Sequence, residues 1–293
     1  MTGGRGFFGS NLVPVLESHG AEVVAAASGE VDVTDAAAVT RSVRDAAPDA
    51  LVHCAILNDF ARLYSDRAAA WAAYVGATRN VVDAANTTGA HVVLISTDWV
   101  FDGTQRRATE DEPPNPINAY GFLKAASELV VTQRAERGAV ARISGVQGVH
   151  RGRPEAPREQ DAGFGYFVAA LVDALRDGRR FVVWDSPEIN TIATPTLAAD
   201  AAELVWRIIV RERSGVHHCC GGEAVTRTTL ARRAVEAFEL EAGLLATGPP
   251  VLKGLPGPVP YDTSLDATAT GAALGVAPPS LDEQLQRLRA EIG

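Results

Sequence analysis

The segment His91-Val-Val-Leu-Ile-Ser96 carries an unbroken apolar core, the pattern of a parallel strand that is buried on both faces. Similar short apolar runs occur before it, at residues 21–27 and 50–55, and after it, at 139–144. Helical stretches separate these runs, at residues 36–47 behind a capping Asp35, at 66–85 and at 118–137. Strands that alternate with helices predict right-handed βαβ units, and therefore an α/β fold with a doubly wound parallel sheet.

The second half of the chain has a less regular pattern. Residues 147–163 are rich in Gly, Pro and charge and predict a loop, and 248–260 form a Pro/Gly-rich tail. We expect helices at 164–177 and 197–211 and strands at 181–184 and 216–219. These segments predict a smaller C-terminal substrate lobe over the carboxyl edge of the sheet. The expected division is a dinucleotide-binding domain at 1–149, to which 178–218 returns, and a substrate-binding lobe at 150–177 and 219–293.

Composition limits the partners and the location of the protein. The 293 residues are 46% hydrophobic, enough for one large core or two unequal lobes, and the net charge of −9 opposes binding to nucleic acid or to an anionic membrane. No run reaches the roughly 18 apolar residues of a membrane span and no secretory signal is visible, so we expect a cytoplasmic protein. Cys54, Cys219 and Cys220 are expected to be buried free thiols. We expect no metal at His217 and His218, because neighbouring residues of a strand point to opposite faces.

A glycine-rich turn stands at the start of the sequence. Gly3, Gly6 and Gly9 are spaced as G-x-x-G-x-x-G, which predicts a turn where the backbone approaches a pyrophosphate at a helix N-terminus. Such a turn normally follows a strand, and here Met1 and Thr2 precede it. We therefore expect that the first strand of this Rossmann-type sheet is truncated and that the natural start lies upstream. Pro14 is a second irregularity, because a proline inside a helix costs about 3 kcal/mol or forces a kink.

Tyr120-Gly-Phe-Leu-Lys124 is the strongest local signal for chemistry. Residues i and i+4 share one face of a helix, so the phenol and the ammonium can meet at one reacting centre. Lys124 is one of only two lysines among 27 basic residues, and chance predicts the Tyr-x-x-x-Lys pattern about 0.03 times per chain. A free phenol has a pKa of about 10, which a nearby ammonium lowers. The pair therefore predicts proton transfer to a carbonyl oxygen; the alternative is a surface helix with a packed tyrosine and a solvated lysine.

The segment Ser96-Thr-Asp-Trp-Val-Phe-Asp-Gly103 lies at a strand end, ahead of that helix. Together with Tyr120-x-x-x-Lys124 it resembles the extended short-chain dehydrogenase/reductase family, and within it the dTDP-4-dehydrorhamnose reductases. The similarity continues at Val31-Asp-Val-Thr-Asp35, Pro48-Asp-Ala-Leu-Val-His-Cys-Ala55 and Asn118-Ala-Tyr-Gly121, and more weakly at Asp262-Thr-Ser-Leu265. The resemblance spans nearly the whole chain. It implies an enzyme that uses NADPH or NADH to reduce a keto group on a nucleotide-activated deoxysugar.

The resemblance also implies roles for individual residues. Tyr120 would be the general acid, Thr97 would hydrogen-bond the substrate carbonyl with Ser96 as its fallback, and Lys124 would hold the nicotinamide ribose. The remaining cofactor-binding set implied by the resemblance is Gly3, Gly6, Phe7, Phe8 and Gly9 at the pyrophosphate, Asp32 and Val33 beside the adenine, and Ala55 and Ile56 along the cleft. No metal ligand is implied.

Some positions depart from the family pattern. His53 and Tyr74 each stand where an Asn is common, and Gly145 stands where rhamnose-forming members carry an aromatic residue, so the sugar stays open. No acidic residue ends the second predicted strand to bind the 2′-hydroxyl of NAD. Arg5 would lie near a 2′-phosphate, and we therefore favour NADPH slightly over NADH.

The substrate side and the rival functions are less constrained. Arg151, Arg153 and Arg158 either bind a nucleotide diphosphate or are solvated loop cations. Thr194-Pro195-Thr196 resembles the family segment that closes the sugar pocket, and Trp184 and Trp206 are expected in the core. Two alternatives remain open: an NDP-sugar epimerase or dehydratase with bound NAD, for which Asp98 is the nearest extra acid/base, and a non-catalytic cofactor-binding regulatory subunit like that of methionine adenosyltransferase. The family also implies a possible homodimer.

Overall fold

A parallel sheet forms the centre of the larger part of the molecule. The computed structural model describes residues 1–27, 29–57, 59–153, 159–252 and 257–293. Its main sheet has the order β1 (Ala50–His53), β2 (His91–Thr97), β3 (Gly138–Ile143) and β8 (Gly215–His218), with every neighbouring pair parallel. All of β2 is buried, as its apolar run predicts. The predicted α/β fold with a doubly wound parallel sheet is confirmed.

Met1 and Thr2 take the place of a first strand in this sheet. Thr2 bridges Ala26 on one side and His53 on the other, both in parallel. The Thr2 amide donates to the Val52 carbonyl at 3.0 Å, and the Ala26 amide donates to the Met1 carbonyl at 3.0 Å. The strand predicted at 21–27 is reduced to the bridge between Ala26 and Thr2.

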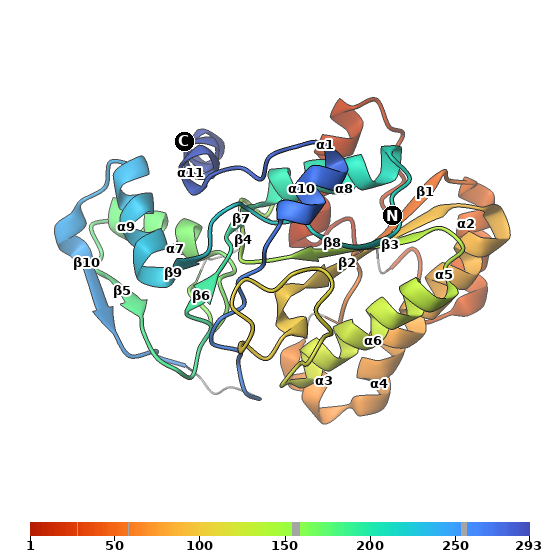
Figure 1. Ribbon diagram of the computed structural model, residues 1–293, viewed down its shortest axis with the longest axis horizontal. Helices are drawn as coiled ribbons and strands as arrows, with labels where there is room; N and C mark the ends of the chain where they lie inside the picture. The colour runs from red at the N-terminus through yellow and green to blue at the C-terminus, as the bar shows by residue number, and fades with distance from the viewer. Residues whose placement is uncertain (28, 58, 154–158, 253–256) are drawn as a thin grey trace.

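Helices cover both faces of the sheet (Figure 1). The helices α1 (Phe7–Ser18) and α8 (Ala198–Val210) pack on one face, and α2 (Ala36–Ala46), α5 (Ala77–Thr88) and α6 (Ala119–Arg134) pack on the other. The helix α1 continues through Pro14, which lies on its exposed side. Among the described residues, no helix is both long and apolar enough to cross a membrane.

The helix predicted at 66–85 forms with an interruption that matters for the site. Asp66 caps it by accepting a hydrogen bond from the Ala69 amide at 3.0 Å, and it ends at Gly89, which has a left-handed backbone. It consists of α4 (Arg67–Trp71), a π-helical turn η1 (Ala72–Gly76) and α5, and a short α3 (Phe60–Ser65) precedes it. Isolated π turns inside helices are often found at functional sites.

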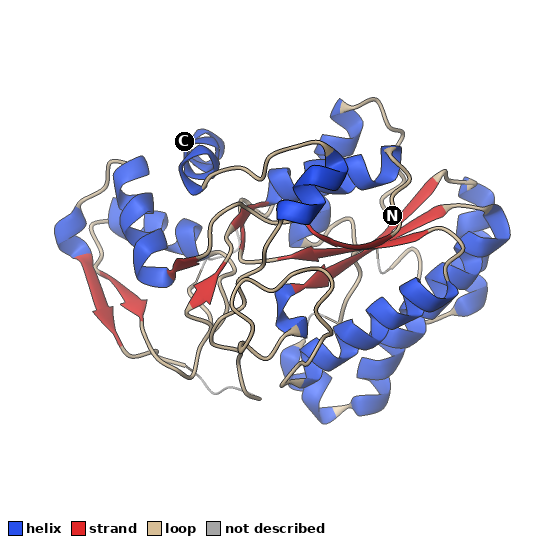
Figure 2. Cartoon of the chain, viewed as in Figure 1, coloured by secondary structure: helices blue, strands red, loops and turns tan. Residues whose placement is uncertain are grey.

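The smaller lobe has a sheet and a core of its own. The strand β5 (Phe181–Trp184) pairs in parallel with β10 (Leu245–Gly248), and α7 (Phe167–Arg176), α9 (Arg227–Ala237) and α11 (Leu281–Ile292) pack beside them (Figure 2). The expectation that all of 178–218 returns to the larger domain is therefore wrong for β5, whose partner is β10. In turn, α10 (Thr268–Leu274) packs against α8 and β8, so part of 219–293 lies with the larger sheet.

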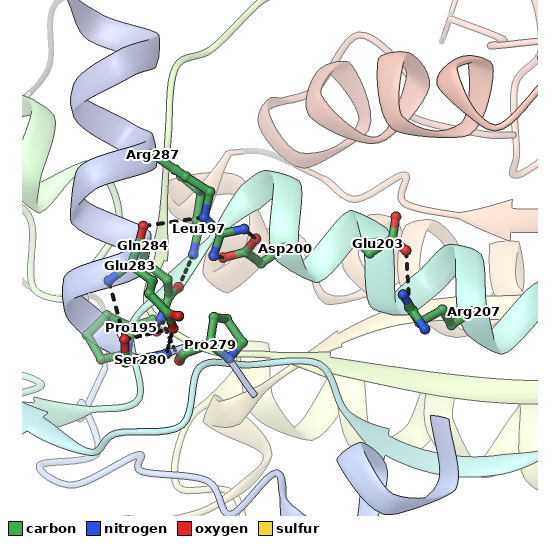
Figure 3. A network of polar contacts seen from close by, with 10 residues as sticks. All are labelled: Pro195, Leu197, Asp200, Glu203, Arg207, Pro279, Ser280, Glu283, Gln284 and Arg287. Carbon is green, nitrogen blue, oxygen red and sulfur yellow. Dashed lines mark hydrogen bonds and ion pairs between the residues drawn. The ribbon is translucent and has the colours of Figure 1, made fainter. Parts of the chain in front are cut away.

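Short strands and the C-terminal helix join the two parts. The strand β4 (Val146–Gln147) pairs with β7 (Thr196–Leu197), and β6 (Ile192–Ala193) pairs with β9 (Val225–Thr226). The side chain of Gln284 on α11 accepts a hydrogen bond from the Leu197 amide at 2.6 Å (Figure 3). Arg287 binds both carboxylate oxygens of Asp200 at the start of α8 (Figure 3). These contacts fasten α11 to the helix that packs on the main sheet.

Candidate active site

A cleft of about 1500 Å³ lies between the carboxyl ends of the strands and the smaller lobe. Its sheet side is formed by the glycine turn, the segment after β1, the end of β2 and the start of α6; its lobe side is formed mainly by residues 159–166. Every residue predicted for catalysis or cofactor binding lines this cleft: Gly3, Arg5, Gly6, Phe7, Phe8, Gly9, Asp32, Val33, Ala55, Ile56, Thr97, Tyr120 and Lys124. Topology brings them together, because the strands that precede them end at one edge of the sheet.

The glycine turn is closely packed and opens a helix toward the cleft. Gly3 has φ +69°, and a Cβ there would lie 2.7 Å from the Ala55 amide nitrogen. A Cβ at Gly9 would overlap the Gly3 carbonyl oxygen, and the Gly6 amide donates to that same oxygen at 3.0 Å. The helix α1 then begins at Phe7, so its first backbone amides are available to an anion. This turn fits the pyrophosphate of a dinucleotide.

Tyr120 and Lys124 lie on the face of α6 that meets the end of β2. Asn118 caps this helix, accepting a hydrogen bond from the Gly121 amide at 2.8 Å. A side chain at Gly121 would overlap the Trp99 carbonyl oxygen, so glycine allows α6 to approach closely. Lys124 is buried, and its ammonium donates to the Ile95 carbonyl at 2.8 Å. The Thr97 side chain lies beside the Tyr120 hydroxyl and lowers the pKa of that group.

Burial controls the protonation of this pair. It raises the pKa of Tyr120 to about 12, while the Thr97 side chain acts in the opposite direction. Burial also lowers the pKa of Lys124 to about 8, although Cys54 and Glu128 act in the opposite direction. The predicted lowering of the phenol pKa is therefore wrong, because a dry site disfavours the charged forms of both groups. At neutral pH the phenol keeps its proton.

Ser96 and Thr97 point to different partners. The Ser96 hydroxyl donates to Glu128 at 2.5 Å, and Glu128 forms a buried ion pair with Arg142 at 2.7 Å. Ser96 is thereby engaged in the interior, which leaves Thr97 as the hydroxyl beside Tyr120. The Asp98 carboxylate accepts hydrogen bonds from three hydroxyl groups. The donors are Thr97 at 3.0 Å, Ser144 at 2.7 Å and Thr263 at 2.6 Å. Burial raises the pKa of Asp98.

The predicted adenine side contains an acidic residue that the sequence analysis missed. Arg5 pairs with Glu30 at 3.6 Å, and the second Glu30 oxygen accepts a hydrogen bond from the Ala27 amide at 2.7 Å. Glu30 lines the cleft four residues beyond the Ala26 bridge, although no acidic residue ends the predicted strand itself. Asp32 accepts hydrogen bonds from the Thr34 hydroxyl and amide, which lower its pKa.

One buried side chain organises the lobe side of the cleft, and sequence reasoning did not find it. Arg227 at the start of α9 is fully buried and donates to the Asn190 carbonyl at 2.6 Å, to the Asp161 carbonyl at 3.0 Å and to the Gly163 carbonyl. Its guanidinium also lies 5.0 Å from the centre of the Phe164 ring. Nothing in the local sequence distinguishes this arginine, because its partners come from two other segments of the chain.

The three arginines predicted near a diphosphate have different positions. Arg151 donates to the Asn11 side chain at 3.2 Å and pairs with Glu291 at 3.7 Å, so it ties α1 to α11 and does not line the cleft. Arg153 lines the cleft, and Arg158 lies outside the described residues. Of these three, Arg153 is therefore the described residue that a diphosphate in the cleft can reach.

Other residues singled out by the sequence lie in varied surroundings. Thr194 and Thr196 are buried and do not line the cleft, and Thr194 donates to the Leu265 carbonyl at 3.1 Å. Trp184 lines the cleft, and Trp206 stacks on His19 with ring centres 5.0 Å apart, so neither is fully buried. The three cysteines are free thiols. Cys219 and Cys220 are buried, and Cys54 faces the cleft. The described residues contain no group of three or more His, Cys, Asp or Glu that could hold a metal ion.

The parallel sheet, the glycine turn and the Tyr120–Lys124 helix define a Rossmann-type α/β protein. The RmlD substrate binding domain family matches residues 1–292, and the chain belongs to that family.

Individual relatives agree with this assignment. A dTDP-4-dehydrorhamnose reductase from Streptomyces griseus is 31% identical over 205 residues, which cover 69% of this chain and 62% of the relative. Methionine adenosyltransferase 2 subunit beta from Rattus norvegicus is 29% identical over 222 residues, which cover 74% of this chain and 62% of the relative. The chain thus matches less than two thirds of the length of either protein. The solved structure of a Bacillus anthracis dTDP-4-dehydrorhamnose reductase in complex with NADP has the same fold, with a TM-score of 0.83, 22% identity, and coverage of 99% of this chain and 97% of that one.

Proposed function

We propose that this protein is an NAD(P)H-dependent reductase of a keto group on a nucleotide-activated deoxysugar. The observation that carries the proposal is that Tyr120, Thr97 and Lys124 line the same cleft as the glycine turn. The similarity to a reductase named for dTDP-4-dehydrorhamnose supports the substrate class.

The cofactor would lie along the sheet side of the cleft. The pyrophosphate would rest on Gly3, Gly6 and Gly9 beside Phe7 and Phe8. The adenine would lie against Asp32 and Val33, the rest of the dinucleotide along Ala55 and Ile56, and Lys124 would hold the nicotinamide ribose. Arg5 favours NADPH, whereas its partner Glu30 is of the type that binds the ribose of NADH. When bound, the nicotinamide supplies a hydride to the keto carbon.

Tyr120 would supply the proton that the keto oxygen acquires. Its pKa of about 12 keeps the phenol protonated until the oxygen becomes basic, as hydride reaches the carbon. On substrate binding the Thr97 hydroxyl would turn from Asp98, to which it donates in the free protein, and donate a second hydrogen bond to the keto oxygen. The Lys124 ammonium would stabilise the phenolate that remains after proton transfer. The products are the alcohol and the oxidised cofactor, and Tyr120 regains its proton from solvent.

The same geometry weighs against a dehydratase. Elimination of water needs a further acid or base beside the sugar, and Asp98 was the nearest candidate in the sequence. Its carboxylate accepts hydrogen bonds from three hydroxyl groups and is buried. Asp98 therefore suits a structural role better than proton transfer with substrate.

Turnover with dTDP-4-keto-6-deoxyglucose and NADPH tests the proposal. Oxidation of NADPH together with a new sugar alcohol would support it. Redox-neutral isomerisation or dehydration would favour the epimerase or dehydratase instead. Cofactor binding without turnover of a broad panel of keto sugars would favour a non-catalytic subunit, in line with the similarity to a methionine adenosyltransferase subunit.

Three further parts of the proposal concern the whole protein. We assign sugar-nucleotide binding to the smaller lobe, with β5 included, and we retain a cytoplasmic location and a homodimer as expectations. Light scattering of the purified protein tests the dimer, and cell fractionation tests the location.

A further inference from the structure

Tyr74 contacts both members of the Tyr120–Lys124 pair. The Lys124 ammonium nitrogen lies 5.7 Å from the centre of the Tyr74 ring. The same ring meets Tyr120 edge-on, with ring centres 6.1 Å apart and planes at 84°. An ammonium within about 6 Å of an aromatic ring centre is attracted by the electron density of the ring face.

The fold holds this ring firmly. Tyr74 is 3% exposed and lies in the π-helical turn η1. Its carbonyl accepts a hydrogen bond from the Thr78 hydroxyl at 2.7 Å, and its own hydroxyl donates to the Leu57 carbonyl at 3.3 Å. Leu63 and Val75 pack beside it in the same core cluster. Hydrogen bonds at its backbone and at its hydroxyl, together with this packing, therefore fix the position of the Tyr74 ring.

The other groups around Lys124 stabilise its ammonium only in part, so the Tyr74 ring contributes substantially to that stabilisation. Burial raises the pKa of Cys54 to about 12 and lowers that of His53 to about 3, so both are uncharged near neutral pH. Glu128 is already paired with Arg142. Among the described residues, the Ile95 carbonyl accepts the one hydrogen bond recorded for the ammonium.

We propose that Tyr74 is a positioning residue, whose ring face holds the ammonium of Lys124 in place beside Tyr120. Its effect on catalysis rests on the proposed function, whereas its effect on Lys124 does not. Asparagine, common at this position in the resembling family, would offer the ammonium no such face.

Titration of Lys124 by lysine acylation over a pH series, read by peptide mass spectrometry, tests this inference in the full chain. The chain contains two lysines, so the labelled peptide is easily assigned. Tyr74→Leu should lower the apparent pKa of Lys124 by about 0.5–1.5 units, because the ring favours the charged form. Tyr74→Phe keeps the ring and should leave the pKa in place. Val75→Ala is the matched control, since it loosens the same turn without removing the ring.

A fluorinated series separates electrostatics from packing, and it serves if Tyr74→Leu does not fold. Phenylalanines with increasing fluorination at position 74 keep the shape of the ring but weaken its negative face. The pKa of Lys124 should fall stepwise along the series. The inference is overturned if the titration of Lys124 is unchanged along the series, or if Val75→Ala shifts it as far as Tyr74→Leu does.

Activity provides a separate readout. If the enzyme reduces keto sugars, the kcat–pH profile of Tyr74→Leu should move with the Lys124 titration, and that of Tyr74→Phe should not. A shifted titration in a protein with no turnover would retain the inference and reject the proposed function. Turnover together with an unshifted titration of Lys124 would retain the proposed function and reject the inference about Tyr74.

Discussion

The two walls of the cleft are built by different means. On the sheet wall, Thr97 and Lys124 are held by the end of a fully buried strand and by a helix that packs directly against it. On the lobe wall, residues 160–163 form a loop whose backbone carbonyls converge on the single side chain of Arg227. Reacting groups need fixed positions, which strand ends provide, whereas a loop can change to suit another sugar while the sheet stays the same.

The largest expected effect comes from removing the proton donor on the sheet wall. Tyr120→Phe should lower kcat by about 10²–10⁴-fold, because the ring still packs but no acid reaches the keto oxygen. Cofactor affinity should change little, since Lys124 and the glycine turn remain. Steady-state kinetics and cofactor titration measure both, with Tyr261→Phe, an exposed tyrosine away from the cleft, as the control. Wild-type kcat in Tyr120→Phe would show that the proton comes from another group.

The next effect should fall on the lobe wall. Arg227→Met leaves the carbonyls of Asp161, Gly163 and Asn190 without their donor and should cost about 2–4 kcal/mol of unfolding free energy. The KM for the sugar nucleotide should rise more than kcat falls, because the reacting groups lie on the other wall. Urea denaturation and kinetics test this. The control Arg207→Met removes an arginine from a partly exposed helical ion pair and should cost less than 1 kcal/mol. An equal loss of unfolding free energy in Arg227→Met and Arg207→Met would contradict the assigned role of Arg227 in the lobe wall.

A smaller effect should follow from pH. Burial lowers the pKa of Lys124 to about 8, and under the proposed function its charged form would bind the ribose hydroxyls. Cofactor affinity should therefore be constant below about pH 7 and weaken as pH rises through 8, by up to about tenfold per unit. Calorimetry across this range measures it. Lys124→Met should bind weakly with a flat profile; a profile that still bends near pH 8 in this variant would assign the titration elsewhere.

The smallest effect is expected at the exposed rim of the sheet wall. Arg5→Gln should weaken the binding of NADPH relative to that of NADH by about 3–10-fold. The effect is small because the pair of Arg5 with Glu30 is largely solvated and screened. Glu30→Gln should shift the preference the other way by a similar factor. Parallel kcat/KM values for the two cofactors decide this, and an unchanged ratio in both variants would place the 2′-position away from this pair.

Prediction from sequence succeeded where the pattern was local. The βαβ order, the cap Asp35 and the span of β2 follow from burial and capping rules that operate within a few residues. The helices α9 and α11 were missed, and β5 was found at its observed bounds but assigned to the wrong part of the chain. A strand's own residues do not specify its partner, and β10 lies more than sixty residues away.

The candidate site divides in the same way. Residue types and spacing pointed to the glycine turn and to Tyr120 and Lys124, whose side chains the topology of a parallel sheet places at one edge. The direction of the Tyr120 pKa was predicted wrongly, because desolvation depends on what covers the phenol, and that cover comes from other elements. The roles of Arg227 and Tyr74 were likewise invisible, since each depends on contacts with distant segments.

By itself the sequence determined the alternation of strands and helices, the family resemblance and the chemical types at the reacting centre, because these depend on neighbours along the chain. Only the tertiary structure decided that Thr2 bridges both Ala26 and His53, that Glu30 joins Arg5 at the rim, and that Tyr74 lies against Lys124. The physical reason is that burial, charge pairing and ring contacts depend on distance in space, which the order of residues along the chain does not specify.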